Sequence, residues 1–290
     1  MKLCRFNDNR LGLVDGEEIA DVTAALGVIP QFGWPAPHGD ALIANLGAVR
    51  AEVDKIAAAA QRLAISDVKL LSPVANPTKV MGAPVNYKAH QAEAQDDAGV
   101  NFGQQIKSID EYGMFLKSPV LVGPSEGVAL HFTDRRNDHE MEISAIIGRE
   151  GKNIAYDDAL DYVAAYAIGL DMTVRGTEER SLRKAIDSYS VLGPWLVTAD
   201  EIADPHNMEF SLHVGDVERQ KSNTGMLVFD IPKLIEWTSS YYTLYPGDVI
   251  MTGTPEGVGP VVPGDVMHCT AEHIGRMDVA VRAAPAAWTA

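Results

Sequence analysis

Short apolar runs bounded by turn residues recur along most of the chain, and they predict β-strands. Such runs cover residues 2–6, 11–14, 141–147, 162–171, 195–197, 210–214 and 249–251. Two similar turns, Tyr-Pro-Gly-Asp at 245–248 and Val-Pro-Gly-Asp at 262–265, each lead into a run that begins with Val. Pro followed by Gly suits the centre of a type II turn, where the second central residue needs a positive φ. The pattern therefore favours a mainly β protein.

Helical spacing of apolar residues is confined to fewer stretches. Leu, Ile and Val recur at helical intervals through the Ala-rich residues 38–65, and shorter helical stretches fall near 157–164, 177–185 and 231–241. Pro73, Pro77 and their polar neighbours mark a boundary near residue 72. We therefore expect a small N-terminal α/β accessory domain over residues 1–72 and a mixed, mainly β (α+β) domain over residues 73–290.

Composition and charge exclude several classes of protein. The chain is 46% hydrophobic and 22% charged, which is ordinary for a soluble globular protein, and its formal net charge is −16. No cluster of Lys and Arg offers a basic face to a phosphate backbone, so we expect no nucleic-acid partner, and an acidic surface disfavours anionic membranes. The first residues lack the apolar core of a signal peptide, no apolar run of membrane length follows, and Cys4 and Cys269 stand far apart. We therefore expect a cytoplasmic protein.

The first candidate for chemistry is the pair Glu140 and Glu142 at the start of an apolar strand. On a strand this spacing places both carboxylates on one face and Met141 and Ile143 on the other. Two like charges side by side are unfavourable unless a cation bridges them or one binds a proton. A solvated strand face is the ordinary explanation, but the apolar run that follows is typical of a buried strand.

A third carboxylate, Asp171, ends the apolar run of residues 162–170, so it lies at the end of a strand that we expect to be buried. A charge in that position needs a partner or a metal. Three carboxylates without His or Cys form a hard, oxygen-rich set of ligands, which suits Mg²⁺ or Mn²⁺ better than Zn²⁺.

Three other features could act beside such a site, and each has an ordinary alternative. His90 and Glu93 meet on one helical face, where the carboxylate would orient the imidazole as a general base, although this spacing is also common on surfaces. Lys184 could stabilise negative charge, or it could be a solvated helix residue. The Gly-rich loop with Gly253 and Thr254 offers backbone N–H groups and a hydroxyl to a carboxylate, and it lacks both the P-loop and the dinucleotide-binding pattern. The polar segment 91–112 is either a plain loop or a lid.

Taken together and in this order, these motifs resemble the fumarylacetoacetate hydrolase family. The resemblance runs from about residue 80 to 281, and the segment before it is similar to that family's small leading domain. The matching stretches are NYKAHQAE (86–93), EMEISAIIG (140–148), Asp171 with Arg175, Lys184, LGPW (192–195), RQKSNTGMLVFDIPKLI (219–235) and GTPEGVG (253–259). Departures at Leu170, Gly176 and Ala185-Ile186 remove no candidate ligand, but they bear on the identity of the substrate.

The resemblance implies a β-roll fold for the C-terminal domain, a homodimer and a site at the mouth of the roll. It implies that Glu140, Glu142 and Asp171 bind the metal, and that His90 and Glu93 form a catalytic dyad beside a charge-stabilising Lys184. It also implies that Gln220 and Thr254 contact the oxo-acid end of a small-molecule substrate, with Gly253 and Arg175 as further substrate-binding residues.

The leading hypothesis is a metal-dependent hydrolase that cleaves a C–C bond in an acylpyruvate or a fumarylacetoacetate-like 1,3-dicarbonyl acid. The family also includes isomerases, hydratases and decarboxylases, so one of these activities on a 2-oxo or 2-hydroxymuconate-type diacid is the near alternative. A non-catalytic ligand-binding relative is the third hypothesis. The intact His90 and Glu93 pair speaks against it, because pure binding needs no base.

Overall fold

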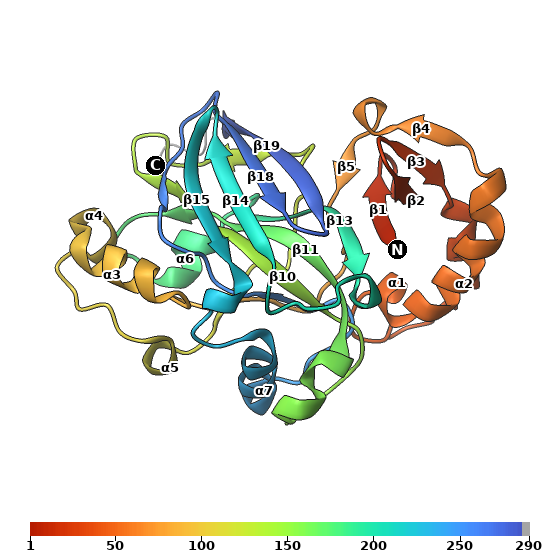
Figure 1. Cartoon of the computed structure of the whole chain (residues 1–290), viewed down its shortest axis with the longest axis horizontal. Coiled ribbons are helices and arrows are strands. Elements are labelled where there is room, and N and C mark those ends of the chain that lie inside the picture. Colours follow the sequence, from red (N-terminus) through yellow and green to blue (C-terminus); the bar gives the residue numbers. More distant parts are fainter. Residues whose placement is uncertain (286–290) are drawn as a thin grey trace.

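A large sheet forms the centre of the protein, whose computed structural model describes residues 1–285; residues 286–290, the end of the expected second domain, lie outside the described part. The strand order is β4-β3-β2-β1-β13-β11-β10-β16-β6-β7, and β5 pairs with β1. Figure 1 labels the part of this sheet from β4 to β10. The strands of this sheet are β1 Lys2–Phe6, β2 Arg10–Asp15, β3 Glu18–Asp21, β4 Arg62–Ala64, β5 Leu70–Leu71, β6 Val80–Gly82, β7 Phe115–Lys117, β10 Met141–Ile147, β11 Val163–Asp171, β13 Ser190–Thr198 and β16 Val249–Met251.

Two smaller sheets complete the strand structure of the described residues. One has the order β15-β14-β18-β19-β8, and the other has the order β12-β9-β17. Their strands are β8 Val128–Leu130, β9 Asn137–His139, β12 Thr173–Val174, β14 Glu209–Val214, β15 Val217–Asn223, β17 Gly259–Pro260, β18 Val266–Ala271 and β19 Gly275–Ala283. The mixed, mainly β class expected from the sequence is confirmed.

Short helices lie around the sheets. The α-helices are α1 Ala41–Ala44, α2 Leu46–Ile56, α3 Lys88–Asp96, α4 Ala98–Asn101, α5 Ile109–Tyr112, α6 Arg180–Lys184 and α7 Ile231–Tyr241. The helix predicted near 231–241 matches α7, whereas the stretch near 157–164 forms a 3-10 helix over Tyr156–Tyr162 and the stretch near 177–185 contains only the five residues of α6. The polar segment 91–112 is not a continuous loop, since it holds most of α3 together with α4 and α5. Among the helices described, none has the length and apolar character needed to cross a membrane.

The N-terminal segment adds its strands to the central sheet. Strand β1 pairs antiparallel with β13, with Lys2 opposite Val197 and Leu3 opposite Leu196. Figure 1 shows these first strands and helices α1 and α2 grouped at one end of the molecule. The sheet therefore continues across residue 72, and the division into an accessory and a larger domain at that residue stays a prediction.

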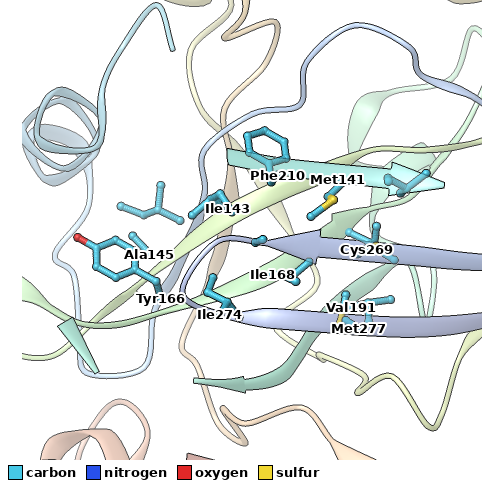
Figure 2. Close-up of a cluster of buried hydrophobic side chains, with 14 of the residues drawn as sticks. Met141, Ile143, Ala145, Tyr166, Ile168, Val191, Phe210, Cys269, Ile274 and Met277 are labelled. Carbon is cyan, nitrogen blue, oxygen red and sulfur yellow. The ribbon is translucent and has the colours of Figure 1, made fainter. Parts of the chain in front are cut away.

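Hydrophobic side chains pack against both faces of the large sheet. On one face, β10 and β11 meet the five-stranded sheet, and Figure 2 shows Met141 and Ile168 in this core together with Phe210 and Met277. On the other face, apolar residues of α1 and α2 belong to one cluster with Ile146 of β10. A strand that is buried on both faces has a continuous apolar run rather than an alternating one, which explains the sequence of β10.

Strand β13 is longer than the sequence predicted, because Gly193 and Pro194 lie inside it. A proline has no N–H to donate to a β-ladder and usually marks a strand end. Here the pairing of β11 with β13 shifts register between Tyr166 and Ile168, next to the position where Ile168 faces Gly193. The irregularity accommodates the proline, and the strand continues to Thr198.

The two Pro-Gly-Asp turns have the positive φ expected at glycine, 87° at Gly247 and 104° at Gly264, but their aspartates differ. Asp248 is fully buried and accepts hydrogen bonds from the backbone N–H groups of Thr78, Lys79 and Tyr245, and its carboxylate also pairs with the Lys79 ammonium. The carboxylate of Asp265 accepts a single hydrogen bond, from the N–H of Val262 at the surface. Both turns make backbone contacts, but only the aspartate side chain of the first turn joins distant segments of the chain.

The substitution Asp248→Ala should lower the free energy of unfolding by about 3–5 kcal/mol, because it leaves a lysine and several buried N–H groups without their partner. The matched substitution Asp265→Ala should cost less than about 1 kcal/mol, since one exposed hydrogen bond contributes little. Denaturant unfolding of both variants measures the difference. Equal losses would contradict the role assigned to Asp248.

Candidate active site

A cavity of about 440 Å³ lies where the ends of β10 and β11 meet helices α3 and α6. The three carboxylates expected to bind metal line it, together with His90, Lys184 and Thr254. Residues from these separate parts of the sequence therefore share one cavity.

The register of two strands brings the carboxylates together. Strands β10 and β11 pair antiparallel with Met141 opposite Leu170, and the N–H of Asp171 donates to the carbonyl of Glu140 at 2.9 Å. Ligand atoms of Glu140, Glu142 and Asp171 all lie within 4.8 Å of one another, and each residue is at least 96% buried. No other such group of acidic, His or Cys residues occurs in residues 1–285.

Three buried cations contact these carboxylates. The Lys184 ammonium uses its three N–H groups on Glu140 at 2.6 Å, Asp171 at 2.6 Å and the hydroxyl of Thr173 at 2.7 Å. The Arg175 guanidinium donates to Glu140 at 2.8 Å. The Lys117 ammonium donates to Asp171 and to the carbonyls of residues 184 and 189, so it is fully engaged inside the protein.

The carboxylates are unequally compensated. Burial by itself would raise the pKa of Glu140, but Lys184 and Arg175 outweigh it and hold the pKa well below its usual range. Glu142 forms no ion pair within the described chain, and its one hydrogen bond comes from the N–H of Gly253 at 2.6 Å. Burial and the neighbouring Asp171 raise the pKa of Glu142 well above its usual range.

The three carboxylates fit a divalent cation. Their donor set is entirely oxygen, which suits Mg²⁺ or Mn²⁺. Glu142 gives the specific reason to expect a metal ion here. A bound cation would stabilise this buried carboxylate most, because it has no ion pair within the protein. Glu140, Glu142 and Asp171 could therefore hold the ion together.

The expected dyad forms on helix α3. The Nδ1 atom of His90 lies 3.2 Å from Glu93, and the other carboxylate oxygen of Glu93 accepts the N–H of Gly257 at 2.9 Å. Burial would raise the pKa of Glu93, but the hydrogen bonds from His90 and Gly257 lower it overall, which keeps the carboxylate charged. His90 is 94% buried and lines the same cavity as the three carboxylates. Glu93 therefore orients the imidazole through Nδ1.

The residues expected to contact substrate divide into two groups. Thr254 and Arg175 line the cavity, although the Thr254 hydroxyl already donates to the carbonyl of Met141 at 2.8 Å. Gln220 and Gly253 do not line it. The Gln220 amide donates to Thr254 at 2.7 Å and accepts from the N–H of Met141 at 3.1 Å, while the Gly253 N–H is taken by Glu142. Gln220 and Gly253 therefore support the wall of the site in this structure, and their contact with a substrate stays a prediction.

Several functional candidates were missed in the sequence. Lys117 gave a weak signal, a lysine in an apolar strand after Phe115 and Leu116, and only the packing shows that its ammonium reaches Asp171. Asp138, two residues before Glu140, bridges Arg136 and Arg175 at 2.7 Å each. Asp138 belongs to a run of polar residues directly before a buried strand, and that run could have indicated it. Only the pair of glutamates that follows was singled out from the sequence.

Part of the segment 91–112 covers the cavity. Asn101 at the end of α4, Phe102 and Gln104 after it, and Tyr112 at the end of α5 belong to its lining. The segment is connected to the body of the protein by an ion pair from Asp97 to Arg136 at 2.8 Å and by the hydrogen bond from the Gly257 N–H to Glu93. Its position over the cavity makes it the candidate for a lid.

Comparison with known proteins relates the chain to one family. The family model described as fumarylacetoacetate (FAA) hydrolase C-terminal matches residues 79–282. A maleylpyruvate hydrolase of Aquipseudomonas alcaligenes is 51% identical over 285 residues, which is 97% of this chain and 99% of that protein. A mitochondrial oxaloacetate tautomerase of Rattus norvegicus is 37% identical over 223 residues, which is 72% of this chain and 68% of that protein.

Solved structures of related enzymes also match the fold of this chain. The crystal structure of a maleylpyruvate hydrolase from Sphingobium sp. SYK-6, in complex with manganese(II) and pyruvate, matches with a TM-score of 0.83 at 40% identity and covers 98% of this chain and 100% of that chain. A 5-carboxymethyl-2-hydroxymuconate delta-isomerase from Mycobacterium smegmatis matches with a TM-score of 0.70 at 29% identity, with the same coverage.

Glu142→Gln should weaken Mn²⁺ binding by more than about 100-fold. Loss of a residue that only supports a metal ligand costs up to about 100-fold, and Glu142 is expected to be a ligand itself. The metal-free variant should remain at least as stable as the native protein, because burial already disfavours the charged form of Glu142 and no cation loses a partner in the substitution. Titration of Mn²⁺ with free-ion detection, with thermal unfolding in chelator, measures both effects. Glu150→Gln, an exposed glutamate beyond the far end of β10, is the control for net charge. Unchanged Mn²⁺ affinity in Glu142→Gln would remove Glu142 from the metal site.

A ligand in the cavity should slow amide hydrogen exchange across residues 97–112, because a lid gains contacts when it closes over a bound molecule. The comparison uses the Mn²⁺-loaded protein with and without oxalate, a mimic of a 2-oxo acid. Strand β10, buried in both states, provides the internal reference. Equal exchange in both states would show that the segment is an ordinary surface region.

Proposed function

The chain belongs to the fumarylacetoacetate hydrolase family, and we propose that it is a metal-dependent hydrolase of the C–C bond in acylpyruvates of the maleylpyruvate type. One observation carries the proposal: a single cavity joins three carboxylates that suit a divalent ion to a His90–Glu93 pair that suits activation of water. Identity of 51% along nearly the full length of a maleylpyruvate hydrolase supports the class of substrate.

The charges of the site support an anionic substrate. The buried carboxylates of the site are Glu140, Glu142, Asp171 and Asp138, and four cations, Lys184, Arg175, Lys117 and Arg136, match them in number. A divalent ion held by Glu140, Glu142 and Asp171 therefore leaves the cluster positive. When bound, Mg²⁺ or Mn²⁺ supplies Lewis-acid polarisation of the 2-oxo and carboxylate oxygens of the substrate. The sequence indicated Lys184 and Arg175 at this site, and the structure adds Lys117.

The chain's own residues account for the movement of protons and charge. His90, oriented by Glu93, takes a proton from water, and the hydroxide adds to the carbonyl carbon of the acyl group. The bond from that carbon to the methylene carbon of the pyruvate part breaks, and its electron pair stays with the pyruvate part. That part takes a proton at the methylene carbon to give pyruvate, and the acyl group leaves as a carboxylate. The buried Lys184 ammonium stabilises the negative charge of the departing fragment.

The direct test is turnover of maleylpyruvate by the Mn²⁺-loaded protein. The proposal expects loss of the 1,3-dicarbonyl absorbance together with release of one pyruvate per substrate. The similarity to an oxaloacetate tautomerase makes oxaloacetate the comparison substrate, with enol–keto conversion as the assay. Tautomerisation without C–C cleavage of any acylpyruvate would replace the hydrolase by the isomerase alternative.

Three finer features belong to the proposal. Mg²⁺ serves beside Mn²⁺ as the ion, which the all-oxygen donor set supports. A homodimer and a cytoplasmic location are carried over from the family resemblance and the sequence.

His90→Ala should lower kcat/KM by about 10² to 10⁴, the usual contribution of a general base, while Mn²⁺ affinity stays unchanged. Glu93→Gln should lower the rate by a smaller factor, because the imidazole remains and loses only its orienting charge. The control is His268→Ala, which removes a histidine paired with Asp278 at 2.8 Å on the surface strands β18 and β19. Native turnover by His90→Ala would falsify the assignment, and loss of Mn²⁺ from that variant would place His90 among the ligands instead.

A further inference from the structure

Arg180, the first residue of α6, is a cation without a counter-ion in the cavity. Its side chain is partly buried and lines the cavity with the metal-site carboxylates. Within residues 1–285, its guanidinium forms no ion pair and no hydrogen bond, and it lies over the rings of Tyr112 at 4.7 Å and Phe115 at 5.2 Å. Burial lowers the pKa of Arg180, which is the expected direction for a cation taken out of water.

The other cations close to the carboxylates already have hydrogen-bond partners within the protein. The Lys184 ammonium has three protein acceptors, and Arg175 is shared between Asp138 and Glu140. Arg183 also lines the cavity and forms no ion pair within residues 1–285, but its Nε already donates to the carbonyl of Glu178 at 2.8 Å. Arg180 therefore keeps all of its guanidinium donors available, and a guanidinium presents them in a planar fork that matches a carboxylate.

The position of Arg180 suits the far end of a substrate held at the metal site. Residues four apart lie on the same face of a helix, about 6 Å apart along its axis, so Arg180 and Lys184 project from one side of α6. Both cations also lie over the same ring, since the Lys184 ammonium is 5.1 Å from the centroid of Phe115. Their separation is thus no more than the sum of the two distances to that centroid, 5.2 Å for Arg180 and 5.1 Å for Lys184, and a short acyl chain spans such a separation.

We propose that Arg180 binds the carboxylate at the acyl end of a diacid substrate and so makes the enzyme prefer dicarboxylic acylpyruvates to monocarboxylic ones. The proposal rests on the proposed function, in which the opposite, oxo-acid end of the substrate lies at the metal site. In maleylpyruvate the two carboxylates stand at opposite ends of the chain, so one molecule reaches both positions. Stacking on Tyr112 and Phe115 holds the guanidinium plane in place before the substrate arrives.

The test compares one diacid, maleylpyruvate, with one monoacid, acetylpyruvate, in Arg180→Gln. Loss of a charge-assisted pair should lower kcat/KM for maleylpyruvate by about 10- to 100-fold. The value for acetylpyruvate, which has no second carboxylate, should stay within about twofold. Arg180→Lys should recover part of the maleylpyruvate activity, because it restores the charge without the planar fork. The matched control is Arg149→Gln, which removes an exposed guanidinium stacked over Tyr162 at 4.0 Å, beyond the far end of β10.

Each other outcome overturns the proposal in a recognisable way. Equal losses on both substrates would show that Arg180 fastens α6 to the neighbouring Tyr112 and Phe115 as a structural contact. Unchanged activity on maleylpyruvate would show that the second carboxylate is bound elsewhere. Failure of the proposed function looks different, because the native enzyme would then cleave neither acylpyruvate.

Discussion

The antiparallel pairing of β10 with β11 is the constraint on which the site depends. Its register places Glu140, Glu142 and Asp171 together in the protein interior, where like charges repel most strongly. The protein tolerates this cluster only because cations come from elsewhere in the fold, Lys184 from α6 and Lys117 from β7. Since losing one partner leaves a buried charge without compensation, these elements must assemble together. The charge cluster thus couples the folding of the site to the folding of the sheet.

The two hydrophobic cores give this cluster its rigidity. Strand β10 is buried on both faces, by the five-stranded sheet on one side and by the N-terminal helices on the other. The N-terminal segment contributes no residue to the cavity wall, yet it covers the strand that carries Glu142. Its role in the site is therefore mechanical, because ligands on a strand fixed from both sides keep their geometry when the ion or the substrate leaves.

Recognition belongs to more variable elements around that rigid centre. The carboxylates stand on strands, whereas the wall of the cavity is built by short helices and loops, chiefly α6 and the segment from α3 to α5. This arrangement explains how hydrolases, isomerases and tautomerases share one scaffold, since a change in the wall alters the far end of the substrate and leaves the metal site intact. Arg180 and Tyr112 both lie on this wall, and Arg180 falls in the stretch between Gly176 and residues 185 and 186, where we expect departures from the family pattern.

The sequence by itself determined the features that depend on local periodicity. Alternation on a strand places Glu140 and Glu142 on the same face, and the pitch of a helix brings Glu93 to His90, so both pairs were predictable without the fold. The tertiary structure decided whatever depends on long-range packing. It alone shows that Lys117 reaches Asp171, that Gln220 supports the wall from behind, and that Arg180 has no counter-ion. The physical reason is that the partner of a buried charge is set by the pairing of distant strands, and no local pattern of residues records that pairing.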